Sequence, residues 1–237
     1  MTPLLPRLLR ALDRFNAARP WDHNAYFHPW ILRQLPRRFD SALDVGSGSG
    51  DLARLLATRA ATVHGIDPDP AIVARARELA PPANPNPNTN PNAPTVTFTV
   101  ADALTGIPGG AYDVITCVAV LHHLPLADAL AVLRDHLAPG GTLVVVGLAR
   151  QQTPVDHLLA AVSSPLNAAT GWLKHHGRTS PAPRPVAMTA LTRPADTGFA
   201  TVAREARRIL PGARLRRRLF WRYTLVWRDR PHGRVRM

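Results

Sequence analysis

The chain has 237 residues and a formal net charge of +13; 46% of its residues are hydrophobic and 19% are charged. These proportions are ordinary for a globular protein and exclude wholesale disorder, a coiled coil and a collagen-like fibre. No apolar run approaches the ~20 residues of a membrane-spanning helix, and residues 1–15 do not form a secretory signal. Because Cys117 is the single cysteine, we expect no internal disulfide and a cytoplasmic protein without a membrane span.

The first 36 residues read as a helical cap. Leucines at helical spacing predict an amphipathic helix over residues 4–15. Pro29 suits the first turn of a helix, so a second helix is expected to run from there to Leu35.

After the cap, short apolar runs alternate with segments of helical periodicity. Runs of this kind predict buried strands at residues 42–45, 63–66, 96–100, 112–118 and 142–146. The segments that follow the first, second and fourth runs carry leucine, isoleucine or valine at helical spacing. Strands that alternate with helices indicate an α/β fold with a parallel sheet covered on both faces.

The remaining segments complete one domain over residues 37–237. Residues 81–94 are rich in proline and asparagine and predict a flexible or extended loop. Residues 150–196 form a variable segment with one helix expected at 155–162. Residues 197–230 predict a helix at 199–210 and then a β-rich end.

The most informative motif runs from Leu43 to Gly50, where a strand turns through alternating glycines into a helix. Glycines allow a ligand close to the backbone, and the helix N-terminus then offers free N–H groups. The motif lacks the Gly-Lys-Ser/Thr ending of a phosphate-binding loop and the Gly-x-Gly-x-x-Gly spacing of a dinucleotide fold. Of the ligand classes considered for this motif, a smaller ligand that bears a carboxylate is the one that is left.

Two further carboxylates follow predicted strands. Asp67 ends the second strand, 21 residues after Gly46, where a carboxylate can accept both hydroxyls of a ribose. Asp102 ends the third strand and can accept a hydrogen bond from an exocyclic amine such as that of adenine. Each acid alone is as consistent with a helix cap. Together with Asp44, which precedes the glycines of the first motif, they place three acids around one crevice and favour a nucleoside ligand.

With these residues the sequence resembles the class I S-adenosylmethionine-dependent methyltransferases. The segments that carry the resemblance occur in the family's order at residues 43–50, 65–67, 100–102, 112–115, 121–124 and 137–143. Residues 21–28 and 210–227 resemble a bacterial small-molecule subgroup. The resemblance implies a Rossmann-like, doubly wound sheet of seven mostly parallel strands, with the last two strands forming a hairpin at about 214–228.

The resemblance also implies a role for each part of the crevice. The glycine loop would hold the methionyl part of S-adenosylmethionine, Asp67 the ribose, Asp102 the adenine amine, and the backbone near Cys117 the methionyl amine. The expected cofactor-binding residues are therefore Asp44, Gly46, Ser47, Gly48, Gly50, Asp67, Pro68, Asp102, Ala103 and Cys117.

Two histidines leave the fourth strand toward the crevice. His122 or His123 could act as a general base, and a role in packing or helix entry is an equal alternative. A nucleophilic role for Cys117 is weaker than that of a buried small side chain. No histidine or cysteine has a partner at a metal-ligand spacing, so no metal site is expected.

The acceptor side of the crevice is expected to come from the cap. The candidate residues for the acceptor are Trp21, Asn24, Tyr26 and His28, although aromatic side chains beside a leucine-rich helix also pack as core.

The function that we expect is transfer of a methyl group from S-adenosylmethionine to a small-molecule acceptor. The last 38 residues hold 12 arginines against two acids, which leaves open an RNA methyltransferase that uses this basic region. A half-buried strand with arginine stems over apolar surface explains the same pattern and argues against a nucleic-acid partner. The third alternative is a non-catalytic cofactor-binding module.

Overall fold

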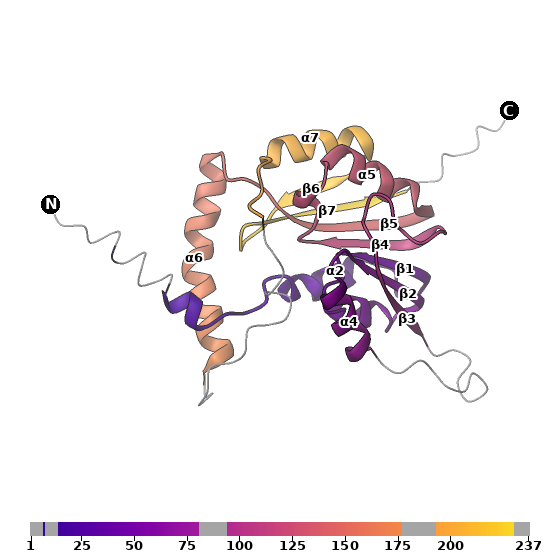
Figure 1. Cartoon of the computed structure of the whole chain (residues 1–237). Helices are drawn as coiled ribbons and strands as arrows, with labels where there is room; N and C mark the ends of the chain where they lie inside the picture. Colours follow the sequence, from indigo (N-terminus) through magenta and orange to yellow (C-terminus); the bar gives the residue numbers. More distant parts are fainter. Residues whose placement is uncertain (1–6, 8–13, 81–93, 177–192, 230–237) are drawn as a thin grey trace.

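A seven-stranded sheet forms the centre of the computed structural model, which describes residue 7 and residues 14–80, 94–176 and 193–229 (Figure 1). The strand order is β3-β2-β1-β4-β5-β7-β6, and β7 runs antiparallel to both β5 and β6. The expected Rossmann-like class I methyltransferase fold is thereby confirmed. The strands are β1 (Phe39–Val45), β2 (Ala60–Asp67), β3 (Thr95–Val100), β4 (Tyr112–Val118), β5 (Leu137–Leu148), β6 (Arg214–Arg217) and β7 (Arg222–Arg228).

Helices cover both faces of the sheet, and each face has its own apolar core. Figure 1 shows α5 (Leu126–Asp135) and α7 (Phe199–Ile209) together on one face, where they pack with Leu143 and Leu225. Residues of α2 (His28–Gln34), α3 (Asp51–Leu56) and α4 (Pro70–Leu79) form the opposite core with Val114 and Val144. There are also two short 3-10 helices: η1 (Ala25–Phe27) leads into α2, and η2 (Leu121–His123) follows β4.

The fifth strand begins earlier than its sequence indicates. The apolar run predicts a strand from Thr142, after a helix that ends at Pro139-Gly140-Gly141, but β5 begins at Leu137. The register with β4 shifts between Tyr112 and Val114, so the glycines lie within an irregular start of the strand.

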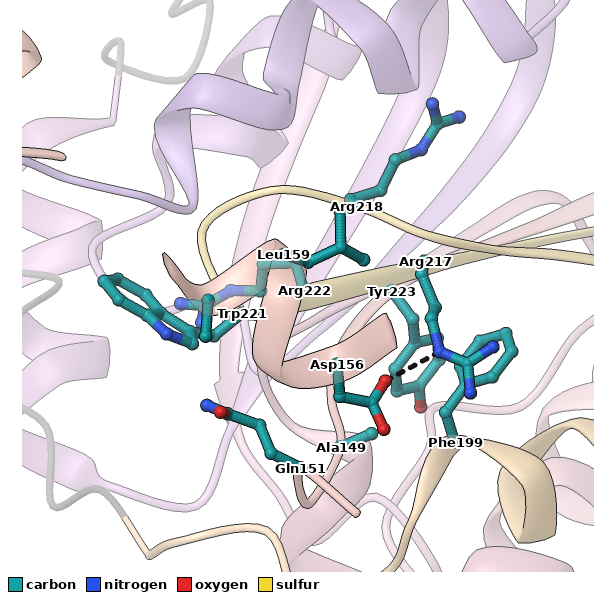
Figure 2. A pocket seen from close by; sticks show the side chains of 11 residues that line it. Ala149, Gln151, Asp156, Leu159, Phe199, Arg217, Arg218, Trp221, Arg222 and Tyr223 are labelled. Carbon is teal, nitrogen blue, oxygen red and sulfur yellow. Dashed lines mark hydrogen bonds and ion pairs between the residues drawn. The ribbon is translucent and has the colours of Figure 1, made fainter. Parts of the chain in front are cut away.

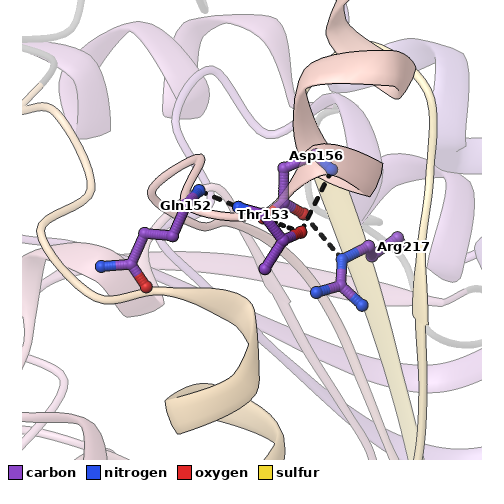
Figure 3. A network of polar contacts seen from close by, with 4 residues as sticks. All are labelled: Gln152, Thr153, Asp156 and Arg217. Carbon is purple, nitrogen blue, oxygen red and sulfur yellow. Dashed lines mark hydrogen bonds and ion pairs between the residues drawn. The ribbon is translucent and has the colours of Figure 1, made fainter.

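The variable segment contains a helix much longer than predicted, α6 (Pro154–His175), which continues through Pro165. Thr153 caps it: its Oγ1 accepts the N–H of Asp156, and its own N–H donates to the Asp156 carboxylate (Figure 3). The same carboxylate pairs with Arg217 of β6 at 2.7 Å, so the start of α6 is tied to the hairpin.

The same side of α6 also contacts the N-terminal segment and the turn of the hairpin. Buried Ser163, Asn167 and Gly171 lie four residues apart, which places them on one side of the helix. Asn167 accepts a hydrogen bond from the indole of Trp21 at 2.9 Å, and Ser163 accepts one from the backbone N–H of Phe220 at 2.8 Å.

Residues 14–18 are helical, but most of the helix predicted over 4–15 lies outside the described residues. The same holds for nearly all of the loop predicted at 81–94, which joins α4 to β3. In the described part of the chain, no helix is long and apolar enough to cross a membrane.

Candidate active site

The loop between β1 and α3 lies at the carboxyl edge of the sheet and is held against β2. The N–H groups of Gly46 and Ser47 both donate to the carbonyl of Ile66, at 2.8 and 2.9 Å. The φ of Gly50 is +81°, and a Cβ there would lie 2.4 Å from Phe98 Cζ. The path of the loop therefore requires glycine at this position.

Asp44 lies one residue before the end of β1 and is 2% exposed. Its Oδ1 accepts a hydrogen bond from Thr116 Oγ1 at 2.7 Å, and within the described residues no basic side chain forms an ion pair with it. Burial raises the pKa of Asp44 to about 7, although the hydrogen bond from Thr116 opposes the rise. A cationic group on a ligand would stabilise the ionised form of this carboxyl.

Asp67 ends β2 and spans the gap to the glycine loop. Its Oδ2 accepts the N–H of Gly48 and its Oδ1 accepts the N–H of Asp69, both at 3.0 Å. The pKa of Asp67 is raised, because the effect of burial exceeds the opposite effect of these two backbone hydrogen bonds. An ionised carboxylate has about four acceptor sites, so Asp67 can hold the loop and still accept hydroxyls from a ligand.

Asp102 follows β3 and is exposed. Its Oδ1 accepts the N–H of Leu104 at 2.8 Å, which folds the chain back after the strand. One carboxylate oxygen has no protein hydrogen bond among those found in the described residues, so it is available to an amine.

These groups line one cavity of about 520 Å³, within the range of about 300–1,000 Å³ that is common for cofactor sites. The expected site residues that line it are Asp44, Gly46, Ser47, Gly48, Asp67, Pro68, Asp102, Ala103, His123, Asn24 and His28. The expected residues that do not line it are Gly50, Cys117, His122, Trp21 and Tyr26.

Cys117 lies inside the core of β4, fully buried among apolar side chains. Burial, and then the neighbouring Asp44 carboxylate, raises the pKa of its thiol to about 12. The thiol is therefore protonated at neutral pH and does not suit nucleophilic attack.

His122 and His123 form the end of η2 with their ring centroids 3.9 Å apart. His123 lines the cavity, whereas His122 is turned inward and its Nδ1 is buried without a partner among the described residues. Burial, and then the charges of His123 and Arg222, lowers the pKa of His122 to about 4. Burial also lowers the pKa of His123, and Arg193 contributes. Both imidazoles are thus neutral at pH 7, but only His123 faces the cavity, and the low pKa of His122 makes it a poor proton acceptor.

The cap residues divide into two groups. Asn24 and His28 face the cavity, and burial lowers the pKa of His28. Trp21 is 3% exposed and packs edge-on against Phe220, while Tyr26 is 50% exposed and lies edge-on to the same ring. Trp21 and Tyr26 therefore belong to the packing between the N-terminal segment and the hairpin.

Several lining residues were not singled out from the sequence. Asp22 lines the mouth, and its Oδ1 accepts the N–H of Asn24 at 2.7 Å and that of Ala25 at 3.1 Å. Val118, Ala119 and Val120 also line the cavity, and Val120 lies against Gly46 of the glycine loop. Their sequence signal is their place at the end of β4 and directly after it, at the carboxyl edge.

In the described residues, no group of three or more histidine, cysteine, aspartate or glutamate side chains is arranged to hold a metal ion.

A methyltransferase domain family matches residues 43–143, the span from the glycine loop to β5. An uncharacterised methyltransferase of Mycobacterium bovis is 29% identical over 215 residues, which cover 89% of this chain and 98% of that protein. A trans-aconitate 2-methyltransferase of Streptomyces avermitilis is 34% identical over 145 residues, 59% of this chain and 51% of that protein.

Among solved structures, the N-methyltransferase NodS from Bradyrhizobium japonicum is similar in fold. Its TM-score is 0.54 at 16% identity, and the alignment covers 87% of this chain and 96% of NodS. Together with the strand order and the glycine loop, these findings identify the chain as a class I S-adenosylmethionine-dependent methyltransferase. It is related to bacterial methyltransferases that act on small molecules.

Proposed function

We propose that this methyltransferase acts on a small-molecule acceptor, which binds between the carboxyl edge of the sheet and the segment from Asp22 to His28. One observation carries the proposal: the same cavity is lined by the glycine loop, Asp67 and Asp102 and also by Asn24, His28 and His123. A cofactor held by the first group would share the cavity with an acceptor that contacts the second.

The chain's residues fit S-adenosylmethionine in three respects. Asp44 is a buried carboxyl without a basic partner in the described residues, which suits the methionyl ammonium. The Oγ of Ser47, a residue that lines the cavity, is buried without a partner in the described residues. Asp67 retains acceptor sites for ribose hydroxyls, and Asp102 retains one for the adenine amine.

When bound, S-adenosylmethionine supplies a methyl group on a sulfonium, which is already an activated donor. The protein's contribution is to align the acceptor in line behind that methyl and to exclude water. His123 is neutral at pH 7 and can remove a proton from an acceptor with a high pKa, whereas a more acidic acceptor needs only to be positioned.

Relatives support a small acceptor. One is named trans-aconitate 2-methyltransferase, and another, from Burkholderia multivorans, is named ubiquinone biosynthesis O-methyltransferase. We infer from the packing of residues 14–36 that the N-terminal part acts as a cap over the acceptor rather than as a separate domain.

The test is methyl transfer from S-adenosylmethionine with a labelled methyl group, added with the protein to a cell extract that is then separated into small molecules, RNA and protein. We expect label in the small-molecule fraction. With Asp67→Asn we expect none when the concentration of S-adenosylmethionine is below the Kd of the variant for it. Label in RNA would establish the RNA enzyme instead. Absence of label, with calorimetry showing that S-adenosylhomocysteine binds, would favour a non-catalytic module.

A further inference from the structure

Arg222 is a basic side chain at the active-site edge that the cofactor site does not use. Since β7 is antiparallel, its first residue, Arg222, pairs with Leu148 at the end of β5, the same edge that carries the glycine loop. Tyr223 packs into the α5 and α7 core, so Arg222 projects from the opposite face. There its Nη2 donates to Asn24 Oδ1 at 3.0 Å, and Asn24 lines the large cavity.

The guanidinium of Arg222 is poorly satisfied. Its Nε is buried and has no hydrogen-bond partner among the described residues, none of whose carboxylates lies within 4.0 Å of the guanidinium. The carboxylate of Asp22 is near but forms no ion pair with it: burial lowers the pKa of Arg222 to about 10, and the charge of Asp22 opposes this only in part. Burial of a cation without a paired anion is costly, so the site favours an incoming negative charge.

Arg217 shows what a satisfied arginine of the same hairpin looks like. It pairs with Asp156 at 2.7 Å and lies over the ring of Phe199 (Figure 2). Arg217 and Arg222 line the same small cavity of about 30 Å³, which has room for about two water-sized groups, the size of a carboxylate. Arg222 thus lines this small cavity and, through Asn24, contacts the wall of the large one.

The two imidazoles near Arg222, those of His23 and His122, carry no negative charge that could pair with it. The Nδ1 of His122 is buried without a partner in the described chain. The charge of Arg222 is among the causes, after burial, that hold the pKa values of His23 and His122 below their usual range. Neutral imidazoles beside an unpaired guanidinium cannot neutralise it, but they can donate hydrogen bonds to an anion.

We propose that Arg222 determines acceptor specificity by binding a carboxylate of the methyl acceptor. The inference rests on the proposed function, since it places the acceptor at the mouth formed by Asn24 and His123. The planar guanidinium can offer two parallel N–H groups to a carboxylate, with an expected preference of about 10- to 100-fold over the corresponding amide.

The test measures binding and does not depend on turnover. Small carboxylates and their primary amides, such as 4-hydroxybenzoate with 4-hydroxybenzamide and succinate with succinamide, are titrated by NMR into the protein saturated with S-adenosylhomocysteine. The proteins are the unsubstituted chain, Arg222→Gln, Arg222→Lys and Asn24→Asp. Arg216→Gln is the matched control, because Arg216 is an exposed arginine of the same hairpin.

In the unsubstituted protein we expect at least one acid to bind tenfold or more tightly than its amide. Asn24→Asp places a carboxylate against Arg222 with almost no change of shape, so it should remove that preference without weakening the amide. Arg222→Gln should do the same, Arg222→Lys should retain part of it, and Arg216→Gln should change nothing. If Arg222→Gln does not fold, Asn24→Asp and Arg222→Lys decide the question.

Three results would overturn the proposal. These are the absence of an acid preference in every pair, an equal loss for acids and amides in Asn24→Asp, and a tenfold loss of S-adenosylhomocysteine affinity in Arg222→Gln. The last would mean that Arg222 holds the cofactor's own carboxylate. Label found in RNA in the extract experiment would refute the proposed function by itself, whatever the acid preference.

Discussion

Asp44→Asn should make the stability of the cofactor-free protein less sensitive to pH. The pKa of Asp44 is about 7 in the folded chain, against 3.8 for an ordinary aspartate, because burial disfavours its charge. Between these two values the folded protein holds a proton that the unfolded chain has released. The free energy of unfolding therefore falls as the pH rises, and it stays lower above pH 7.

The magnitude follows from the same two values. Each pH unit between 3.8 and 7 costs about 1.4 kcal/mol, so the full effect is about 4 kcal/mol, of which about 3 kcal/mol lies between pH 5 and pH 8. In a chain of this length that loss corresponds to a fall in Tm of about 6 to 12 °C. The amide introduced by Asp44→Asn would carry no charge at either pH, so this component should disappear in the variant.

The assay is urea unfolding of both proteins at pH 5 and pH 8, with Asp40→Asn as control because Asp40 is an exposed aspartate of the same strand. The unsubstituted protein and the control should lose about 3 kcal/mol more than Asp44→Asn over this range. Saturating S-adenosylhomocysteine should shrink the difference, since its ammonium group would stabilise the ionised carboxylate. Parallel pH dependence of Asp44→Asn and the unsubstituted protein would refute the reasoning.

Three further substitutions test other parts of the site. Asp67→Asn should weaken S-adenosylhomocysteine binding about 10- to 100-fold in calorimetry, because it weakens acceptors for both the ribose and the N–H of Gly48; unchanged affinity would remove the ribose role. His123→Ala should lower turnover by roughly 10²–10⁴ and spare cofactor affinity if His123 is the base, whereas a rate within about threefold of the unsubstituted enzyme would exclude it. Gly50→Ala should lower the free energy of unfolding by about 1–3 kcal/mol in urea titrations, since its Cβ would lie 2.4 Å from Phe98; an undiminished value would show that the loop can relax.

The sheet and the cofactor side of the site could be predicted because both depend on local patterns. A buried apolar run followed by glycine or aspartate marks the carboxyl end of a parallel strand, and such ends meet at one edge. Asp44, Asp67 and Asp102 come together in one cavity for this reason. Nothing comparable marks the start of β5, where Gly140 and Gly141 resemble a helix end but belong to an irregular strand.

The acceptor side depends on contacts between distant residues, which no local pattern encodes. Trp21 does not line the cavity, because its indole N–H donates a hydrogen bond to Asn167, 146 residues further along the chain. Pro165 is a residue type that breaks helices, yet α6 continues through it, and Asn167 and Gly171 on its last turns pack against Trp21 and Arg19. The cap therefore takes its shape from α6, whose length the sequence did not indicate.

The C-terminal arginines show how a net charge can mislead when it is read without partners. Arg217 pairs with Asp156, Arg218 lies over the ring of Trp30, and Arg228 donates to the carbonyl of Gln34. These three side chains bind other parts of the same chain, so they contribute to the formal charge without forming an open surface for phosphates. Arg222 differs from them because its buried Nε has no hydrogen-bond partner in the described chain and its Nη2 donates to Asn24, which lines the large cavity. Internal contacts therefore account for part of the excess charge of the hairpin, whereas Arg214 and Arg216 are exposed.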